Sequence, residues 1–172
     1  MEDTIIKKVE KEDIPDLIHI ARSTFAHTYE HLNDPSNFEA YMSTAMSEEQ
    51  LRKEISDPNS LFYVLKSDDA TVGYLKLNRR EAQTEANMDD SLEIERIYVI
   101  EEMKGRGLGA RLVQKAKEVA LEEGCATLWL GVWDQNTAAQ GFYKNQGFKP
   151  FGEHDFIVGE DRQRDILMML DV

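Results

Sequence analysis

Two basic residues and three glycines share one short segment of the chain: Lys104, Gly105, Arg106, Gly107, Leu108 and Gly109. An apolar run from Leu92 to Val99 precedes this segment, and an amphipathic helical pattern follows it. Glycine has no Cβ, so such a turn can adopt left-handed backbone angles and bring its amides close to an anion. The helix start adds unpaired amides, the positive end of its dipole and the charge of Arg111. The segment therefore predicts a binding site for a phosphorylated cofactor.

Glycine-rich turns occur in several nucleotide-binding folds, and Gly105, Gly107 and Ala110 fit the G-x-G-x-x-A dinucleotide fingerprint. A classical P-loop is excluded, because no Lys-Ser or Lys-Thr follows Gly109. A dinucleotide-binding fold expects a second strand that ends in an acidic residue about 20 residues further on. Here the helical pattern still continues into Glu122. The context argues against a Rossmann fold, and saturable NAD binding would revive it.

A second motif follows after about 30 residues, the spacing that one helix and one strand require. It consists of Asn136 in a polar turn and the run AQGFYKNQGF from Ala139 to Phe148. Together the two motifs resemble those of the GCN5-related N-acetyltransferases (GNAT). That family has a Gln/Arg-x-x-Gly-x-Gly/Ala loop, a later Asn, and a helix with Ala-x-x-Phe-Tyr-x-x-x-Gly-Phe. This sequence has Lys104 where the family usually has Gln or Arg, which we expect to cost little affinity because the loop acts mainly through backbone amides.

The resemblance implies a single N-acetyltransferase domain over residues 1–172, of α/β (α+β) class. It also implies a mixed, mostly antiparallel central sheet flanked by helices, with a V-shaped splay between the two central strands. Hydrophobic periodicity and capping signals predict the elements that build it. The expected strands are Thr4 to Val9, Leu61 to Leu65, Thr71 to Leu77, Leu92 to Val99, Leu128 to Val132, Glu153 to Val158 and Asp165 to Leu170. The expected helices are Ile14 to Phe25, about Ser36 to Asp57 with a capping box at Ser47, Leu108 to Glu123, and one from Thr137.

The resemblance implies acetyl-CoA as the cofactor. The backbone of the triplet 97–99 is expected to pair with the pantetheine arm as an added strand, and one of its amides could polarise the thioester carbonyl. Asn136 would hold the cofactor through its side-chain amide, or would simply cap the following helix. The expected cofactor-binding residues are Ile97, Tyr98, Val99, Lys104, Gly105, Arg106, Gly107, Leu108, Gly109, Asn136 and Tyr143.

Acetylation of an amine poses two proton problems. At pH 7 an alkylammonium with a pKa near 10.4 is a free base in only about one molecule in 2,500. Glu95 is the expected base, directly or through a water, because polyamine acetyltransferases of the family carry a glutamate two residues before this triplet. Tyr143 is the expected acid, since the family's tyrosine protonates the departing sulfur. The alternatives are a structural ion pair of Glu95 with Arg96 or a neighbouring strand, and a core role for Tyr143.

The acceptor is expected to be a small cationic amine. Three segments, at residues 23–29, 92–98 and 129–133, also resemble those of the bacterial PaiA-type spermidine/spermine N-acetyltransferases, and the formal net charge is −13. An acidic wall would concentrate a polyamine, although the acidity could equally serve only solubility. The expected wall residues are Glu30, Glu85, Asp89, Asp90, Glu93 and Glu95. Other small amines, aminoglycosides, peptide or protein amines, and a non-catalytic acyl-CoA-binding regulatory module remain alternatives.

Composition sets further expectations. The acidity argues against a nucleic-acid partner. Cys125 is the single cysteine, so no intrachain disulfide is possible, and the absence of an apolar span indicates a cytoplasmic protein with no membrane partner. His27 and His31 have helical ligand spacing, but no third ligand is visible, so no metal is expected. Trp129 and Trp133 are both expected in the core, with a place at the acceptor cleft as the alternative for Trp133, which is near the strand end. A homodimer is an expectation from family analogy alone.

Overall fold

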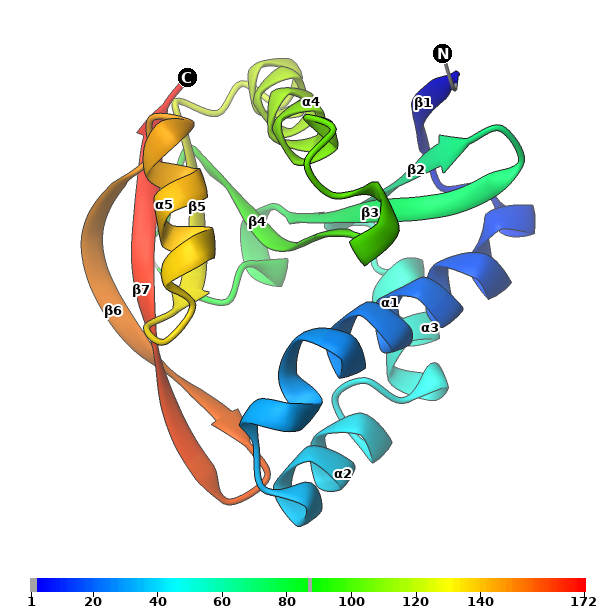
Figure 1. Cartoon of the computed structure of the whole chain (residues 1–172). Helices are drawn as coiled ribbons and strands as arrows, with labels where there is room; N and C mark the ends of the chain where they lie inside the picture. The colour runs from blue at the N-terminus through cyan, green and yellow to red at the C-terminus, as the bar shows by residue number, and fades with distance from the viewer. Residues whose placement is uncertain (1–2, 87) are drawn as a thin grey trace.

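Seven strands form one sheet in the order β1-β2-β3-β4-β5-β7-β6 in the computed structural model, which describes residues 3–86 and 88–172 (Figure 1). The strands are β1 (Thr4–Lys8), β2 (Ser60–Ser67), β3 (Ala70–Asn78), β4 (Ser91–Val99), β5 (Thr127–Trp133), β6 (Lys149–Val158) and β7 (Asp161–Asp171). The helices are α1 (Ile14–Tyr29), α2 (Pro35–Ser43), α3 (Glu48–Ser56), α4 (Leu108–Glu122) and α5 (Thr137–Asn145). Within the described residues, no helix is long and apolar enough to cross a membrane.

The two central strands pair over only part of their length. β4 and β5 run parallel, and their register joins Ser91–Ile94 to Thr127–Leu130. Beyond this contact, within the described part of the chain, β4 is paired only with β3, and β5 only with β7. Every other strand pair in the sheet is antiparallel. The mixed, mostly antiparallel sheet and the splay between its central strands are therefore confirmed.

Apolar stripes divide the core between the two faces of the sheet. The face under α4 buries the predicted helical stripe, of which Leu112, Val113 and Ala116 have no exposed surface. The opposite face is covered by α1, α2 and α3, with Leu17 and Met46 at its centre. Figure 1 shows α4 on one side of the strands and these three helices on the other. Both faces end at the point where β4 and β5 separate.

The predicted helical region from Ser36 to Asp57 consists of two helices, α2 and α3, and the second begins after the predicted capping residue Ser47. Met46 lies between them and is completely buried. The guanidinium of Arg22 on α1 donates to the Met42 carbonyl at 3.0 Å and also to the Met46 carbonyl. This tertiary cap satisfies carbonyls at the end of α2, which allows the chain to turn. The capping box is confirmed in part, since the Ser47 hydroxyl accepts from the Gln50 amide at 3.2 Å.

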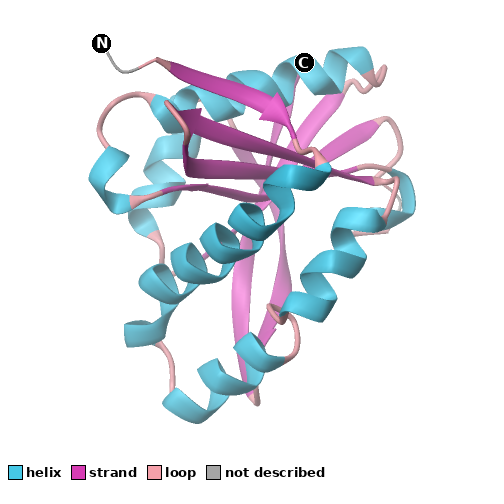
Figure 2. Ribbon diagram, turned by 90° about the vertical axis from the view of Figure 1, so that its right-hand side faces the viewer, coloured by secondary structure: helices cyan, strands magenta, loops and turns pink. Residues whose placement is uncertain are grey.

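The β6–β7 hairpin extends beyond the other strands and reaches α2, as Figures 1 and 2 show. The Glu160 amide in its turn donates to Asn37 Oδ1 at 2.9 Å. Gly159 has a φ of 61°, and a Cβ at this position would lie 2.5 Å from the Asn37 Cα. Glycine is therefore required here by both conformation and space. The contact brings the outer end of the hairpin beside the first helices.

Candidate active site

A cavity of about 650 Å³ opens where the two central strands separate. One wall is the second half of β4, and the opposite wall is the end of β5, from Gly131 to Trp133. The C-terminal half of α1 and one side of α5 close it from the two faces of the sheet. Residues far apart in the sequence therefore meet around one space, and most of the predicted site residues lie on its walls.

The glycine turn has the geometry of an anion site. Gly105 and Gly107 have φ angles of 76° and 77°, and an added Cβ on either would meet no atom within 4 Å. Gly107 is the N-cap of α4 and contributes no side-chain cap, so the first amides of the helix remain without intrahelical partners. Gly109 is helical and instead allows Phe142 to pack closely, 3.3 Å from an added Cβ. The turn fits the phosphates of a nucleotide cofactor.

The basic residues of the turn differ in their contacts. Lys104 lines the cavity and pairs with Glu101 at 2.6 Å. Arg106 contacts the carbonyl of Glu102 at 3.5 Å. Arg111 is directed to the first strand, where it donates to the Thr4 carbonyl at 2.9 Å. Lys104 and Arg106 therefore lie beside the anion site, whereas Arg111 ties α4 to β1.

The backbone of β4 offers a second feature that a cofactor can use. From Glu95 to Val99 the strand has β3 on one edge and no strand on the other. The triplet of Ile97, Tyr98 and Val99 lines the cavity along that open edge. An extended chain such as a pantetheine arm can pair with unpaired strand groups as an added strand. The residues present therefore fit the phosphates and the pantetheine arm of acetyl-CoA.

Tyr143 lies on α5 with its ring against Phe142 and Phe148, at centroid distances of 5.2 and 5.8 Å. The residue lines the cavity and is 9% exposed. Within the described chain, its hydroxyl takes part in no hydrogen bond. Burial raises the pKa of Tyr143 above its ordinary value, and the nearby Tyr29 adds to this shift. The hydroxyl therefore keeps its proton and can act as a donor into the cavity.

Asn136 caps α5, as the alternative reading of this residue anticipated. Its Oδ1 accepts from the Ala139 amide at 3.1 Å. The residue also lines the cavity. Because the cap uses only the side-chain oxygen, the amide nitrogen is still suited to hold a cofactor. The two expected roles are compatible in one geometry.

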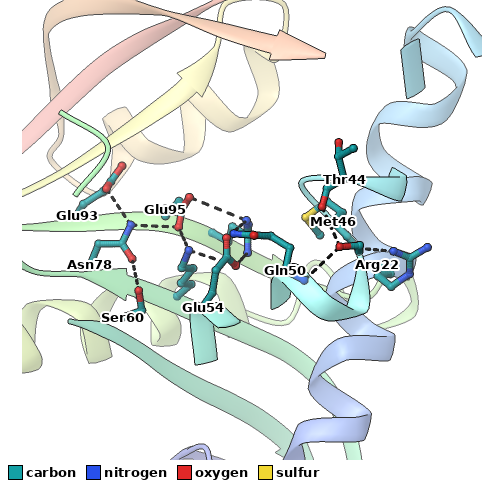
Figure 3. Close-up of polar contacts among 12 residues, drawn as sticks. Arg22, Thr44, Met46, Gln50, Glu54, Ser60, Asn78, Glu93 and Glu95 are labelled. Carbon is teal, nitrogen blue, oxygen red and sulfur yellow. Dashed lines mark hydrogen bonds and ion pairs between the residues drawn. The ribbon is translucent and has the colours of Figure 1, made fainter. Parts of the chain in front are cut away.

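Glu95 belongs to a network of buried charges on β3, β4 and α3 (Figure 3). Its carboxylate pairs with Lys76, accepts from Asn78 at 3.1 Å, and lies 4.0 Å from Arg96. Burial opposes ionisation, but Arg96 and Lys76 outweigh it, so the pKa of Glu95 is held below its ordinary value. The same side chain lines the cavity. Glu95 therefore makes the predicted structural ion pair and also meets the site.

A β-bulge determines how Glu95 is presented. In the register of β3 and β4, Lys76 faces Arg96 and Leu77 faces Ile94, which leaves Glu95 as an extra residue. Regular alternation along the strand would place Glu95 and Arg96 on opposite faces of the sheet, and the bulge removes this alternation. Both reach the charges on the α3 side of the sheet, and Arg96 pairs with Glu54 at 2.9 Å. A bulge breaks the two-residue alternation of a regular strand.

Asn78 joins the two glutamates of β4. Its amide nitrogen donates to Glu93 at 3.0 Å and to Glu95 at 3.1 Å, while its oxygen is 3.4 Å from the Ser60 hydroxyl. Burial raises the pKa of Glu93, although hydrogen bonds from Thr84 and Asn78 oppose this. Sequence analysis did not identify Asn78, because a single amide on a buried strand carries no local motif.

The predicted acidic wall is largely wrong. Of its six residues only Glu95 lines the cavity. Glu93 is 2% exposed, Glu85 pairs with His154 at 2.6 Å, and Asp89 and Asp90 line a separate depression. The carboxylates that do line the cavity are Glu95, Glu101, Glu102 and Asp165.

The part of the cavity nearest α1 and α2 is mainly aromatic. We call it the aromatic chamber, and its residues are Phe25, Tyr29, Tyr41, Trp133, Phe156 and Asp165. The rings contact one another, with centroid distances of 5.8 Å from Tyr29 to Trp133 and 5.5 Å from Tyr41 to Phe156. Trp133 lines the cavity, which is its alternative role rather than the expected core position, and Trp129 is fully buried in the core. Sequence analysis missed Tyr41, Phe156 and Asp165, whose elements meet only in the folded chain.

The histidines show no metal site. His27 is 3.6 Å from Glu101. Among the described residues, no group of three or more potential ligands of the His, Cys, Asp and Glu types is placed to hold an ion.

Comparison with known proteins agrees with this geometry. The model of the acetyltransferase (GNAT) family matches residues 17–148, which is most of the chain. The protein therefore belongs to the GNAT family of acetyltransferases and is an acyltransferase by class.

Individual relatives give the same picture. An uncharacterized N-acetyltransferase in the pepI 3′ region of Lactobacillus delbrueckii subsp. lactis is 42% identical over 163 residues, covering 95% of this chain and 94% of the relative. A spermidine N(1)-acetyltransferase of Thermoplasma acidophilum is 26% identical and covers 84% and 87%. The crystal structure of the PaiA N-acetyltransferase of T. acidophilum in complex with coenzyme A has a TM-score of 0.78 at 24% identity, covering 99% of both chains. That likeness confirms the fold.

Proposed function

We propose that this acetyl-CoA-dependent N-acetyltransferase acetylates a primary amine of a small, multiply cationic acceptor, a polyamine such as spermidine or spermine. Tyr143 and Glu95 line the same cavity, beside the open edge of β4 and the glycine turn, and this is the observation that carries the proposal. The relative from T. acidophilum that is named a spermidine acetyltransferase supports the acceptor class. Transfer is direct, within a complex that contains both substrates.

Each residue has a defined task in this proposal. Bound acetyl-CoA supplies an activated acetyl thioester. The glycine turn from Lys104 to Gly109 would hold the phosphates with its amides and cations, and Asn136 would hold the cofactor through its side-chain amide. An amide of the triplet 97–99 would donate to the thioester carbonyl oxygen, where negative charge develops.

Glu95 accepts the proton that the ammonium must lose, directly or through a water. Its ionised state at neutral pH, secured by Lys76 and Arg96, keeps it able to accept. Tyr143 holds a proton at Oη for the departing sulfur, because burial keeps the pKa of this phenol high. The proton gained by Glu95 and the proton given by Tyr143 are exchanged with solvent after product leaves.

The test is thiol release from acetyl-CoA in the presence of spermidine, spermine, single amino acids, an aminoglycoside or a lysine peptide, with acetyl-CoA binding measured in parallel. Turnover confined to the polyamines is the expected result. Turnover on another member of the panel would replace the acceptor. Binding of acetyl-CoA with no turnover on any amine would identify a regulatory acyl-CoA-binding module instead.

The Tyr143→Phe variant tests the proposed acid. It should lower kcat by about 100-fold or more while acetyl-CoA binding persists, since general acids contribute on that scale. Tyr63→Phe is the matched control, because Tyr63 is an equally buried tyrosine that does not line the cavity. Equal activity of the two variants would remove Tyr143 from the mechanism.

A further inference from the structure

The aromatic chamber contains one carboxylate, Asp165, which lies on the opposite wall of the cavity from Glu95. Asp165 is on β7, directly across from Trp133 of β5 in the register. Its side chain is 14% exposed and lines the cavity. Its Oδ2 contacts His154 Nε2 at 3.1 Å, and among the described residues no donor reaches its Oδ1. Asp165 therefore has one oxygen fixed by the protein and one available to a ligand.

Two features hold Asp165 in this position. His154 lies between Asp165 and Glu85, whose Oε1 is 2.6 Å from His154 Nδ1. One imidazolium between two carboxylates leaves the group with a net negative charge. Gly131 lies beneath this pair, and a Cβ there would be 3.2 Å from both Asp165 Oδ2 and His154 Nε2. The absence of a side chain at position 131 is therefore what makes room for the ion pair at the cavity wall.

The surroundings of Asp165 suit an alkylammonium group. Tyr29 and Trp133 are close to it, and the charge of Asp165 adds to the effect of burial in raising the pKa of Tyr29. Aromatic faces attract organic cations, and a carboxylate supplies a charged acceptor for their N–H groups. Apolar rings around a single anionic group match the alkyl chain and the charged end of an aliphatic amine.

We propose that Asp165 binds the second, non-reacting ammonium group of a diamine or polyamine acceptor, so that this enzyme prefers such acceptors over monoamines. This inference rests on the proposed function and adds the residue that selects the acceptor. Glu95 serves the amine that reacts at β4, and Asp165 serves the amine that remains charged. His154 and Glu85 act through Asp165 and are positioning residues.

A contact to a non-reacting group is the same in the bound substrate and in the transition state. Its loss should therefore raise KM and leave kcat nearly unchanged. The experiment compares putrescine with butylamine, which share a four-carbon chain and differ in the second amino group. In the wild-type protein, kcat/KM should be about 10- to 100-fold higher for putrescine, the scale of a hydrogen bond to a charged group.

Asp165→Asn should raise the KM for putrescine by about the same factor and leave the KM for butylamine unchanged. Asp171→Asn is the matched control, an exposed carboxylate at the far end of the same strand, and should change neither constant. Thermal unfolding of both variants shows whether they fold. The comparison of the two amines in the wild-type protein needs no variant, and equal kcat/KM values would overturn the inference even if Asp165→Asn unfolds.

The outcomes separate this inference from the proposed function. Equal kcat/KM for putrescine and butylamine would overturn the role of Asp165 and leave the acetyltransferase activity intact. Failure to acetylate any amine would overturn the proposed function itself. A fall in kcat for both amines in Asp165→Asn would show a general structural role and would also overturn the inference.

Discussion

Where β4 and β5 separate, the sheet forms two arms: the β4 arm carries Glu95, and the β5–β7 arm carries Asp165. Each arm presents a carboxylate to the same cavity, but the groups that hold the two carboxylates differ. On the β4 arm, Glu95 is held by two cations, Lys76 and Arg96. On the β5–β7 arm, Asp165 is held by His154, whose charge depends on pH. The side chains of Lys76 and Arg96 are 4% and 10% exposed, whereas that of His154 is 20% exposed, and its pKa is raised to about 9. One arm thus holds its carboxylate with buried cations, and the other holds its carboxylate with a ring whose charge is lost in alkaline solution.

Lys76 is the cation at the centre of the β4 arm, and replacing it should have the largest effect on the free energy of unfolding. The side chain of Lys76 is 4% exposed and pairs with Glu95 and, at 3.4 Å, with Glu54. Lys76→Met should lower the free energy of unfolding by about 3–5 kcal/mol, because it leaves buried carboxylates under-compensated. Urea denaturation measures this loss. Lys8→Met, at an exposed position of β1, should stay within about 0.5 kcal/mol of wild type. A loss below about 1 kcal/mol for Lys76→Met would show that Lys76 is not strongly coupled to the carboxylates of Glu95 and Glu54.

Glu95→Gln tests whether the same arm also performs chemistry. If Glu95 accepts the proton, kcat should fall by about 100-fold or more, as for other general bases. Steady-state kinetics at saturating polyamine and acetyl-CoA measure this fall. Glu122→Gln, which changes an exposed carboxylate at the end of α4, should retain full kcat. A stable Glu95→Gln variant with unchanged kcat would leave Glu95 as a counter-ion alone.

On the β5–β7 arm, His154 should have a smaller effect on stability, and this effect should depend on pH. The hydrogen bond to Asp165, with Glu85 adding to it, raises the pKa of His154 from 6.5 to about 9. The raised pKa means that the folded state favours the charged ring. The stabilisation is therefore complete below pH 6.5 and is lost as pH rises through 9.

His154→Gln removes the titrating ring from this arm. The wild-type protein should lose about 1–2 kcal/mol relative to His154→Gln between those pH values, less than the whole shift implies because the ring is partly solvated. Denaturation across this pH range measures the difference. Parallel stability curves for the two proteins would show that His154 carries no charge in the ion pair.

The sequence predicted the parts of the site that depend on local conformation. Gly105 and Gly107 adopt the left-handed angles that their lack of a Cβ permits, and the helix that follows buries its predicted stripe. Asn136 and Tyr143 are placed by the turn and helix of a recognisable motif, and both line the cavity. For these residues, neighbours in the sequence are also the neighbours that determine structure.

The parts that were missed depend on residues distant in the sequence. The turn at Met46 depends on Arg22. The bulge at Glu95 lies where two charged residues of β4 form ion pairs with Lys76 and Glu54. Asp165 enters the site because the hairpin of β6 and β7 returns beside β5. Periodicity reports only which side of an isolated strand a residue takes, so it contains no information about these contacts.

The short pairing of β4 with β5 also bears on how the protein unfolds. Among the residues that the structure describes, four residue pairs, from Ser91 and Thr127 to Ile94 and Leu130, are the only strand pairing between β1–β4 and β5–β7. A ligand that spans the gap beyond them would contact both parts of the sheet and connect them for as long as it is bound. Amide exchange should then slow in the strands on both sides of the gap when the ligand binds. The stability of the sheet is thus expected to depend on whether the cavity is occupied.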